Sequence, residues 1–217
     1  MTFEHKFLTF PEIVNTDLET GRIYTLPDGT QYPSVTTILD RADDGSGLAA
    51  WRARLGRAEA DRQGRIAANR GTKIHTMAEN YLLNRDNVTK GQMPVNIEMF
   101  NFLRKKLDNI SVLYGIECGL YSHALKVAGR TDIFAKYKGV DSVVDNKTSK
   151  RDKEAEWIES YFIQTTAYSI MLEEMFKIEV PQIVVLITTE QGSCQEFIRP
   201  SHEYREKTIA LFKEFNV

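Results

Sequence analysis

Three strand-like runs follow one another in the middle of the chain with no helical pattern between them, and this feature most constrains the fold. They span residues 112–123, 124–137 and 142–148, and Gly129 and Gly139 interrupt their apolar pattern. Consecutive strands of this kind pair as neighbours in one sheet. Helical patterns lie before and after them. The sequence therefore predicts an α/β (α+β) fold with a central mixed β-sheet flanked by helices.

The segment before these strands contains a hairpin pattern and several helical patterns. Apolar alternation on both sides of a Pro-Asp-Gly turn predicts a β-hairpin over residues 22–33. Ser34 is placed to cap a short helix over residues 35–39. Longer helices are expected over residues 49–69, 72–83 and 95–109, with an interruption at Arg70-Gly71.

The segment after them predicts one crossover helix and a returning pair of strands. A helix is expected over residues 153–176, strands over 181–189 and 194–198, and a terminal helix from Ser201. The whole chain, residues 1–217, is expected to form a single domain. Within it, residues 1–110 would form the hairpin and helical part, and residues 111–217 the catalytic sheet core.

Composition excludes several classes of protein. A hydrophobic content of 42% and a charged content of 27% are ordinary for a soluble protein, and no run of about 18 apolar residues predicts a membrane span. Cys118 and Cys194 are the only cysteines and lack a CxxC spacing, so neither a disulfide framework nor an iron–sulfur cluster is expected. A cytoplasmic location is expected.

Positive charge is concentrated in one segment. The chain carries a net charge of −2, but residues 51–73 carry +5. One face could therefore attract phosphate although the rest of the molecule repels it. Charge alone leaves open that this segment is simply a solvated helix. Its basic residues are Arg52, Arg54, Arg57, Arg62, Arg65, Arg70 and Lys73.

Two carboxylates and a lysine indicate chemistry at the end of the strand pair. Asp145 and Lys147 are two residues apart in a strand and so project to the same face. If the strands pair through the turn at Lys138-Gly139, Asp132 lies near them. Close carboxylates repel unless a hard divalent cation, Mg²⁺ or Mn²⁺, takes both as ligands. A surface salt bridge between Asp145 and Lys147 is the alternative.

Such a cation could promote the hydrolysis of a phosphodiester bond. It would bind a phosphate oxygen and lower the pKa of a bound water. Lys147 could hold that water or offset the charge that develops on phosphorus.

The order of four short motifs resembles the PD-(D/E)XK nuclease superfamily, and within it the RecB-like exonuclease branch. That branch has H-x3-E on a helix, then G-x2-D, D-x-K-T, and Q-x3-Y on the next helix. The segment YPSVTTIL, residues 32–39, is similar to the entry segment of phage exonucleases and of the mitochondrial genome maintenance exonuclease. The four motifs read here His75 to Glu79, Gly129 to Asp132, Asp145 to Thr148, and Gln164 to Tyr168.

The resemblance implies a restriction-endonuclease-like core with an N-terminal helical clamp and, if the protein is phage-encoded, a location in a host's cytoplasm. It also implies a role for each motif residue. Asp132, Asp145 and His75 would bind the metal, and the backbone carbonyl of Asn146 would complete its coordination. Lys147 would be the catalytic lysine. Glu79 would orient the imidazole, and Gln164 and Tyr168 would line the site. Asn146 replaces the aromatic or apolar residue that is more common in relatives, and its side chain is expected to face away from the metal.

Contacts with DNA are expected from polar residues around this site. Ser34 could bond a phosphate, although capping its helix is an equal alternative. Lys150 and Arg151 directly follow the catalytic strand and could neutralise the DNA backbone, unless they belong to a solvated turn. Arg70 and Thr148 are also expected to contact DNA.

We therefore expect a Mg²⁺- or Mn²⁺-dependent deoxyribonuclease, an exonuclease acting on single-stranded or frayed DNA ends in replication, recombination or repair. The helices before the sheet would form an arch or clamp over the strand, and replication or recombination proteins are candidate partners. Two alternatives stay open: a structure-specific endonuclease of the same fold, and a nucleic-acid-binding accessory module with an idle site.

Overall fold

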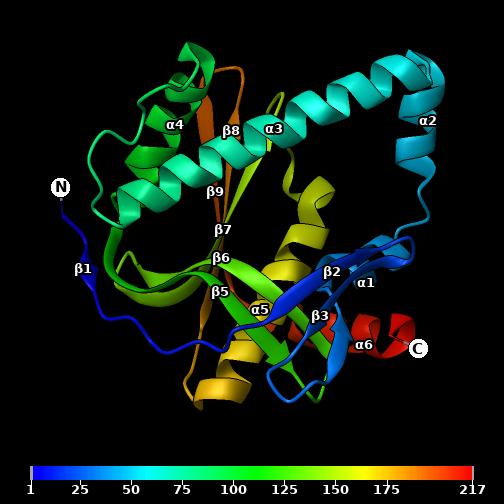
Figure 1. The fold of residues 1–217 in the computed structure, drawn as a ribbon, viewed down its shortest axis with the longest axis vertical. Coiled ribbons are helices and arrows are strands. Elements are labelled where there is room, and N and C mark those ends of the chain that lie inside the picture. Colours follow the sequence, from blue (N-terminus) through cyan, green and yellow to red (C-terminus); the bar gives the residue numbers. More distant parts are fainter. Residues whose placement is uncertain (1, 217) are drawn as a thin grey trace.

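A computed structural model describes residues 2–216, and a six-stranded mixed sheet forms its centre (Figure 1). The strand order is β1-β5-β6-β7-β8-β9. The pairs β1·β5 and β7·β8 are parallel and the others antiparallel. The expected fold class is confirmed. The strands are β1 (Glu4–His5), β5 (Ile110–Ser122), β6 (Val127–Tyr137), β7 (Val140–Ser149), β8 (Gln182–Thr189) and β9 (Ser193–Pro200).

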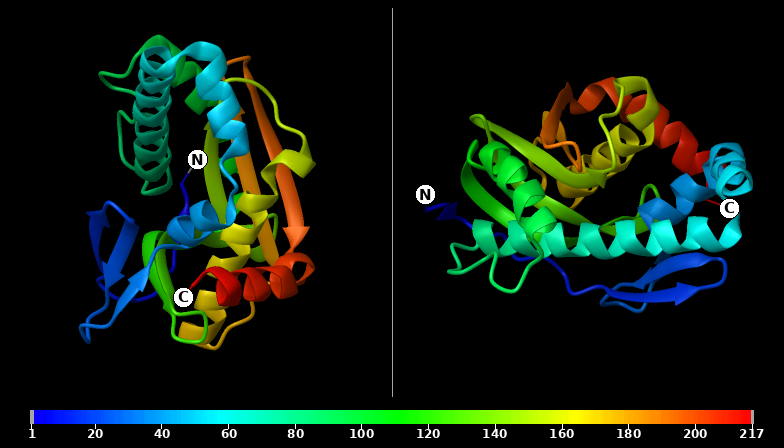
Figure 2. Two further views of the ribbon diagram at one scale, coloured as in Figure 1. Left: turned by 90° about the vertical axis from the view of Figure 1, so that its right-hand side faces the viewer. Right: turned by 90° about the horizontal axis from the view of Figure 1, so that it is seen from above.

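Helices cover both faces of the sheet (Figures 1 and 2). One core lies under α3 (Arg57–Leu82) and α4 (Pro94–Leu107) and includes Val144. Another lies under α1 (Val35–Ala42), α5 (Glu159–Phe176) and α6 (Arg205–Phe215) and includes Val143. Adjacent residues of β7 thus face opposite layers, as strand alternation requires. Among residues 2–216, no helix is long and apolar enough to cross a membrane.

The parallel strands β7 and β8 are joined by the expected crossover helix. It begins with a 3₁₀ turn, η1 (Ala155–Ile158), and continues as α5, which is buried from Phe162 to Leu172. A second 3₁₀ turn, η2 (Ser201–Tyr204), precedes α6 after the return strand β9. The predicted order of elements after the central strands is confirmed.

A small antiparallel sheet lies beside β6. It contains β2 (Val14–Leu18), β3 (Gly21–Thr25) and β4 (Gln31–Pro33), and the predicted hairpin is β3·β4. The strand β2 was not expected because all five of its residues are exposed and carry no apolar alternation. Ser34 caps α1 as expected, since its Oγ accepts a hydrogen bond from the Thr37 backbone at 3.0 Å.

The helix break before the sheet does not lie where the sequence predicted it. The break is at Gly56 (φ 79°), between α2 (Ser46–Leu55) and a continuous α3, and Gly71 lies inside α3. Packing of the second half of α3, with Ile74 and Met77 fully buried, stabilises the helix through this glycine despite its low propensity.

We call residues 46–69 the arm, because α2 and the first half of α3 project beyond the sheet (Figures 1 and 2). Its helix α2 has no buried residue, and the first half of α3 buries only Ala60.

Candidate metal and catalytic site

The candidate site lies where β6 and β7 separate. The two strands pair through a turn in which Lys138 (φ 50°) and Gly139 (φ 84°) both have positive φ, the geometry of a tight hairpin. The last regular pair at the other end is Ile133 with Val144. Beyond this pair, the Asn146 N–H donates to the side chain of Asp132, at Oδ2, at 2.8 Å. A carboxylate thus accepts where a backbone carbonyl would, and it lies next to Asp145 as predicted.

Asp145 and Lys147 form a buried pair rather than a surface salt bridge. The Asp145 side chain is 1% exposed and that of Lys147 is 23% exposed. The ammonium lies 2.7 Å from Oδ2 and 2.9 Å from Oδ1, but only the Oδ1 contact has hydrogen-bond geometry. Oδ2 therefore accepts no hydrogen bond from residues 2–216. Lys147 Nζ also lies 5.2 Å from the centre of the Tyr161 ring.

Burial and neighbouring charge shift both groups of this pair. Burial raises the pKa of Asp145 above its ordinary value; Lys147 opposes this shift, and Asp132 adds to it. Burial lowers the pKa of Lys147, but the charges of Asp145 and Asp132 outweigh it, so the net shift is upward. The lysine is therefore protonated, but its charge does not return the pKa of Asp145 to the ordinary value. A divalent cation held by the carboxylates would add positive charge there.

The helix α3 brings His75 to the same place. Its Nδ1 lies 3.6 Å from Asp132 Oδ2, and the imidazole is 30% exposed. Glu79 lies one turn further along the helix, and both residues line a cavity of about 600 Å³. The expected helical placement of the pair on one face is confirmed, because both side chains face this cavity.

The helix α5 contributes Gln164 and Tyr168 from the opposite layer. Gln164 Nε2 donates to Asp145 Oδ1 at 3.3 Å. Tyr168 is 3% exposed, and burial raises the pKa of its hydroxyl well above the usual value. A Cβ at Gly129 would stand 2.8 Å from Tyr168 Cε1, closer than side chains approach. The glycine of the G-x2-D motif therefore lets the tyrosine pack against β6.

Sequence reasoning missed Glu117, which lies on β5 beside Asp132. Ligand atoms of Glu117, Asp132 and His75 all lie within 4.8 Å of one another, close enough to share a metal ion. Burial and the Asp132 charge raise the pKa of Glu117 to about 7. Its φ of 49° is unusual for a residue with a side chain and costs about 1–3 kcal/mol. The available signal was one acidic residue in an otherwise apolar strand pattern.

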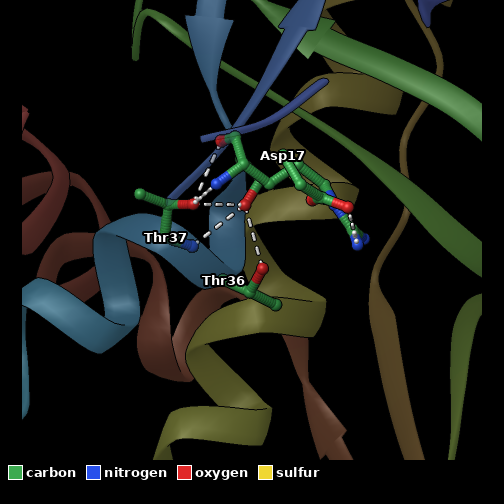
Figure 3. Close-up of polar contacts among 5 residues, drawn as sticks. Asp17, Thr36 and Thr37 are labelled. Atoms are coloured by element: carbon green, nitrogen blue, oxygen red, sulfur yellow. Dashed lines mark hydrogen bonds and ion pairs between the residues drawn. The ribbon is translucent and has the colours of Figure 1, made fainter. Parts of the chain in front are cut away.

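Ser34 is committed to its helix cap. Its side chain is buried, and its Oγ lies 2.9 Å from Thr36 Oγ1 and 2.8 Å from Thr37 Oγ1. Figure 3 shows both threonines in this hydrogen-bond network. Asp17 lies on the other side of the network, where it pairs with Arg22. Ser34 nevertheless lines a second cavity, of about 240 Å³, together with Gln164 and Tyr168.

The two cavities are adjacent, because both are lined by Glu117 and Arg130. They extend from the middle of α3 to the small sheet. Of the predicted site residues, His75 and Glu79 line the first cavity, and Ser34, Gln164 and Tyr168 line the second.

The remaining residues expected to contact DNA differ in how exposed they are. Lys150 and Arg151 are exposed at the end of β7, as a backbone contact requires. Thr148 is half-buried and faces Gly71 of α3. Arg70 is 12% exposed and pairs with Glu190 at the β8–β9 turn, so its guanidinium is occupied by a protein partner. The expected DNA contact of Arg70 would therefore compete with this ion pair.

Comparisons with known proteins add little to this geometry. No family model matches the chain, and no curated protein matches it. One solved structure, of a proposed exonuclease from Eubacterium rectale, aligns with a TM-score of 0.46 and 11% identity over 68% of this chain and 64% of its own. The alignment thus spans less than two thirds of that protein. Another solved structure, of the protein SSO0001, aligns with a TM-score of 0.37 and 14% identity, over 66% of this chain and 72% of its own.

Proposed function

We propose that this protein is a metal-dependent DNA exonuclease of the PD-(D/E)XK superfamily, RecB-like branch, which hydrolyses phosphodiester bonds from single-stranded or frayed ends. One observation carries the proposal. Residues from α3, β6, β7 and α5, widely separated in the sequence, converge where two strands separate: His75, Asp132, Asp145, Lys147 and Gln164. Binding alone would not require carboxylates beside a surface that contacts phosphate.

The residues present fit a Mg²⁺ or Mn²⁺ ion. Asp145 Oδ2 is buried and accepts no hydrogen bond from residues 2–216 although its pair with Lys147 is close. Asp132 and His75 lie next to it, and we assign these three residues, with the backbone carbonyl of Asn146, as ligands. Oxygen ligands with one imidazole suit these cations. When bound, the cation supplies a Lewis acid toward the phosphodiester.

The side chains around the ligands have separate tasks. Lys147 stays protonated and places its positive charge where negative charge develops on the phosphate. Gln164 holds Asp145 Oδ1 and so fixes the rotamer of that carboxylate. The Tyr168 hydroxyl remains neutral, and its ring packs on Gly129. Glu79, which lines the same cavity as His75, orients the imidazole.

The surface around the site supports a single-stranded substrate. The arm carries exposed arginines, of which Arg54 and Arg65 have no ion-pair partner within residues 2–216. We propose that it acts as a clamp over the strand, and that Ser34, Thr148, Lys150 and Arg151 contact the DNA backbone. Such an enzyme would act in replication, recombination or repair, together with proteins of those processes.

The experiment uses single-stranded DNA labelled at either end and a covalently closed single-stranded circle, each with Mg²⁺, Mn²⁺ or a chelator. We expect metal-dependent shortening of the linear strands and an intact circle, because an exonuclease needs an end. The label pattern then gives the polarity.

Other outcomes would overturn the proposal. Cutting of the circle would show an endonuclease of the same fold. Absence of cleavage with both metals, combined with salt-sensitive DNA binding that ignores the metal, would show a binding module.

A further inference from the structure

Glu117 and Asp132 lie directly opposite one another on neighbouring antiparallel strands. The pairs Ile116 with Ile133 and Cys118 with Thr131 bracket them in the register of β5 and β6. Side chains at such positions share one face of the sheet, and like charges there destabilise the pair. The fold thus places two carboxylates against each other, although many neighbouring positions of β5 are apolar.

The backbone at Glu117 adds to this cost. Its left-handed conformation (φ 49°) is uncommon for a residue with a side chain. Arg130 Nη1 donates to the Glu117 backbone carbonyl at 3.2 Å, so this arginine supports the main chain. No hydrogen bond or ion pair from residues 2–216 reaches the Glu117 carboxylate itself. A strained backbone that presents an unpaired carboxylate is characteristic of functional positions.

Other groups already point to a ligand at this place. Glu117 offers a ligand atom within 4.8 Å of those of His75 and Asp132. Independently, Asp145 on the next strand is 1% exposed and has a carboxylate oxygen that accepts no hydrogen bond from residues 2–216. Asp132 lies between these groups, since its Oδ2 accepts a hydrogen bond from the Asn146 N–H next to Asp145, and its carboxylate belongs to the cluster with Glu117.

We propose that Glu117 is an additional ligand of the divalent cation, so that three carboxylates from three adjacent strands and the imidazole of His75 hold it. The inference rests on the proposed function, because it extends the same metal site. Three carboxylates favour a hard divalent cation, and the imidazole admits Mn²⁺ as readily as Mg²⁺. The cation removes the repulsion between Glu117 and Asp132, which offsets the strain at φ 49°.

The test measures metal binding without DNA. Wild type and Glu117→Gln are titrated with Mn²⁺ by isothermal titration calorimetry, and their Tm values are recorded with and without Mn²⁺. We expect affinity to fall at least about 10-fold, as for other groups that support a metal site. In the metal-free protein we expect Tm to stay unchanged or to rise, since the substitution removes a like-charge contact. A merely structural glutamate would show the opposite pattern, a lower Tm and unchanged affinity.

Two further variants complete the design. Glu98→Gln on α4 is exposed and remote from the cluster, so neither its Mn²⁺ affinity nor its Tm should change. Glu117→Asp keeps the charge and tolerates the left-handed backbone well, so it serves if the glutamine variant does not fold. Its carboxylate is one methylene shorter, and we expect it to bind Mn²⁺ more weakly than wild type.

The outcomes separate this inference from the proposed function. Wild-type affinity in folded Glu117→Gln or Glu117→Asp, combined with loss of binding in Asp132→Asn, would overturn the role of Glu117 and leave the metal site intact. Failure of the wild-type protein to bind Mn²⁺ at all would overturn both.

Discussion

The end of the β6–β7 pair and the arm are built in opposite ways. At the strand end, Asp145, Gln164 and Tyr168 are 1%, 8% and 3% exposed, and helices from both layers pack around them. The arm leaves all of α2 without a buried residue, and its charged side chains face solvent. The first region has its geometry fixed by packing, whereas the second offers charge without a fixed geometry.

This difference separates two kinds of contribution to one activity. Side chains that are held by neighbours on several elements act as a unit, so loss of one is not replaced by another. Exposed arginines act together through their summed electrostatic field, so the loss of one changes DNA affinity only a little. Single substitutions should therefore have large effects at the strand end and small, additive effects in the arm.

The largest effect is expected from Lys147→Ala. Removal of the partly buried ammonium takes away the positive charge nearest Asp145, and kcat should fall by about 10²–10³-fold. The matched control is Lys150→Ala, three residues along the chain. Its exposed ammonium is assigned to the DNA backbone, so this substitution should raise KM and change kcat little. The rates are measured on end-labelled DNA, with folding verified by circular dichroism. Equal rates for Lys147→Ala and wild type would contradict the large effect expected of substitutions at the strand end.

The next effect concerns packing between the two layers. In Gly129→Ala the new Cβ would meet Tyr168 at 2.8 Å, so we expect a loss of about 1–3 kcal/mol in the free energy of unfolding. Gly64→Ala is the control in the arm, where no atom lies within 4 Å, and it should instead stabilise α3 by about 0.5–1 kcal/mol. Urea unfolding of both variants measures the two values. The same sign for both would show that the arm is not free of packing.

A smaller effect tests where the arm ends. Arg70→Ala breaks the ion pair that ties α3 to the β8–β9 turn, and we expect a loss of about 1 kcal/mol in stability. Affinity for a short single strand should stay the same. Arg65→Ala, one and a half turns earlier and exposed, should change stability by less than about 0.5 kcal/mol. Lower DNA affinity with unchanged Tm in Arg70→Ala would instead establish it as a DNA contact.

The smallest effect is expected from the arm's unpaired arginines. In the double variant Arg54→Ala, Arg65→Ala, the slope of log affinity for single-stranded DNA against log salt should fall by up to about 1.4, roughly 0.7 for each phosphate that an arginine no longer neutralises. Arg62→Ala should change it less, because Glu59 already holds that guanidinium at 2.8 Å. A slope unaffected by the double variant would remove the arm from the binding surface.

Local patterns in the sequence were sufficient to predict the elements that hold the site. Strand alternation placed Asp145 and Lys147 on one strand face, and helical spacing placed His75 and Glu79 on one helix face, which in the structure lines a cavity. Each of these predictions depends on residues that are close in the chain.

What the sequence could not predict depends on distant partners. Glu117 meets Asp132 only through the register of β5 and β6, and Arg70 meets Glu190 only after α3 has packed on the sheet. The break at Gly56 instead of Gly71 has the same cause, because packing against the sheet outweighed local helix propensity.

One measurement tests the central claim most directly. End-labelled single-stranded DNA is incubated with wild type or Asp132→Asn, in Mg²⁺, in Mn²⁺ and in chelator. We expect the strand to shorten only with wild type and only when either metal is present. Shortening in chelator, or at the same rate with Asp132→Asn, would contradict a metal-dependent site at the end of β6 and β7.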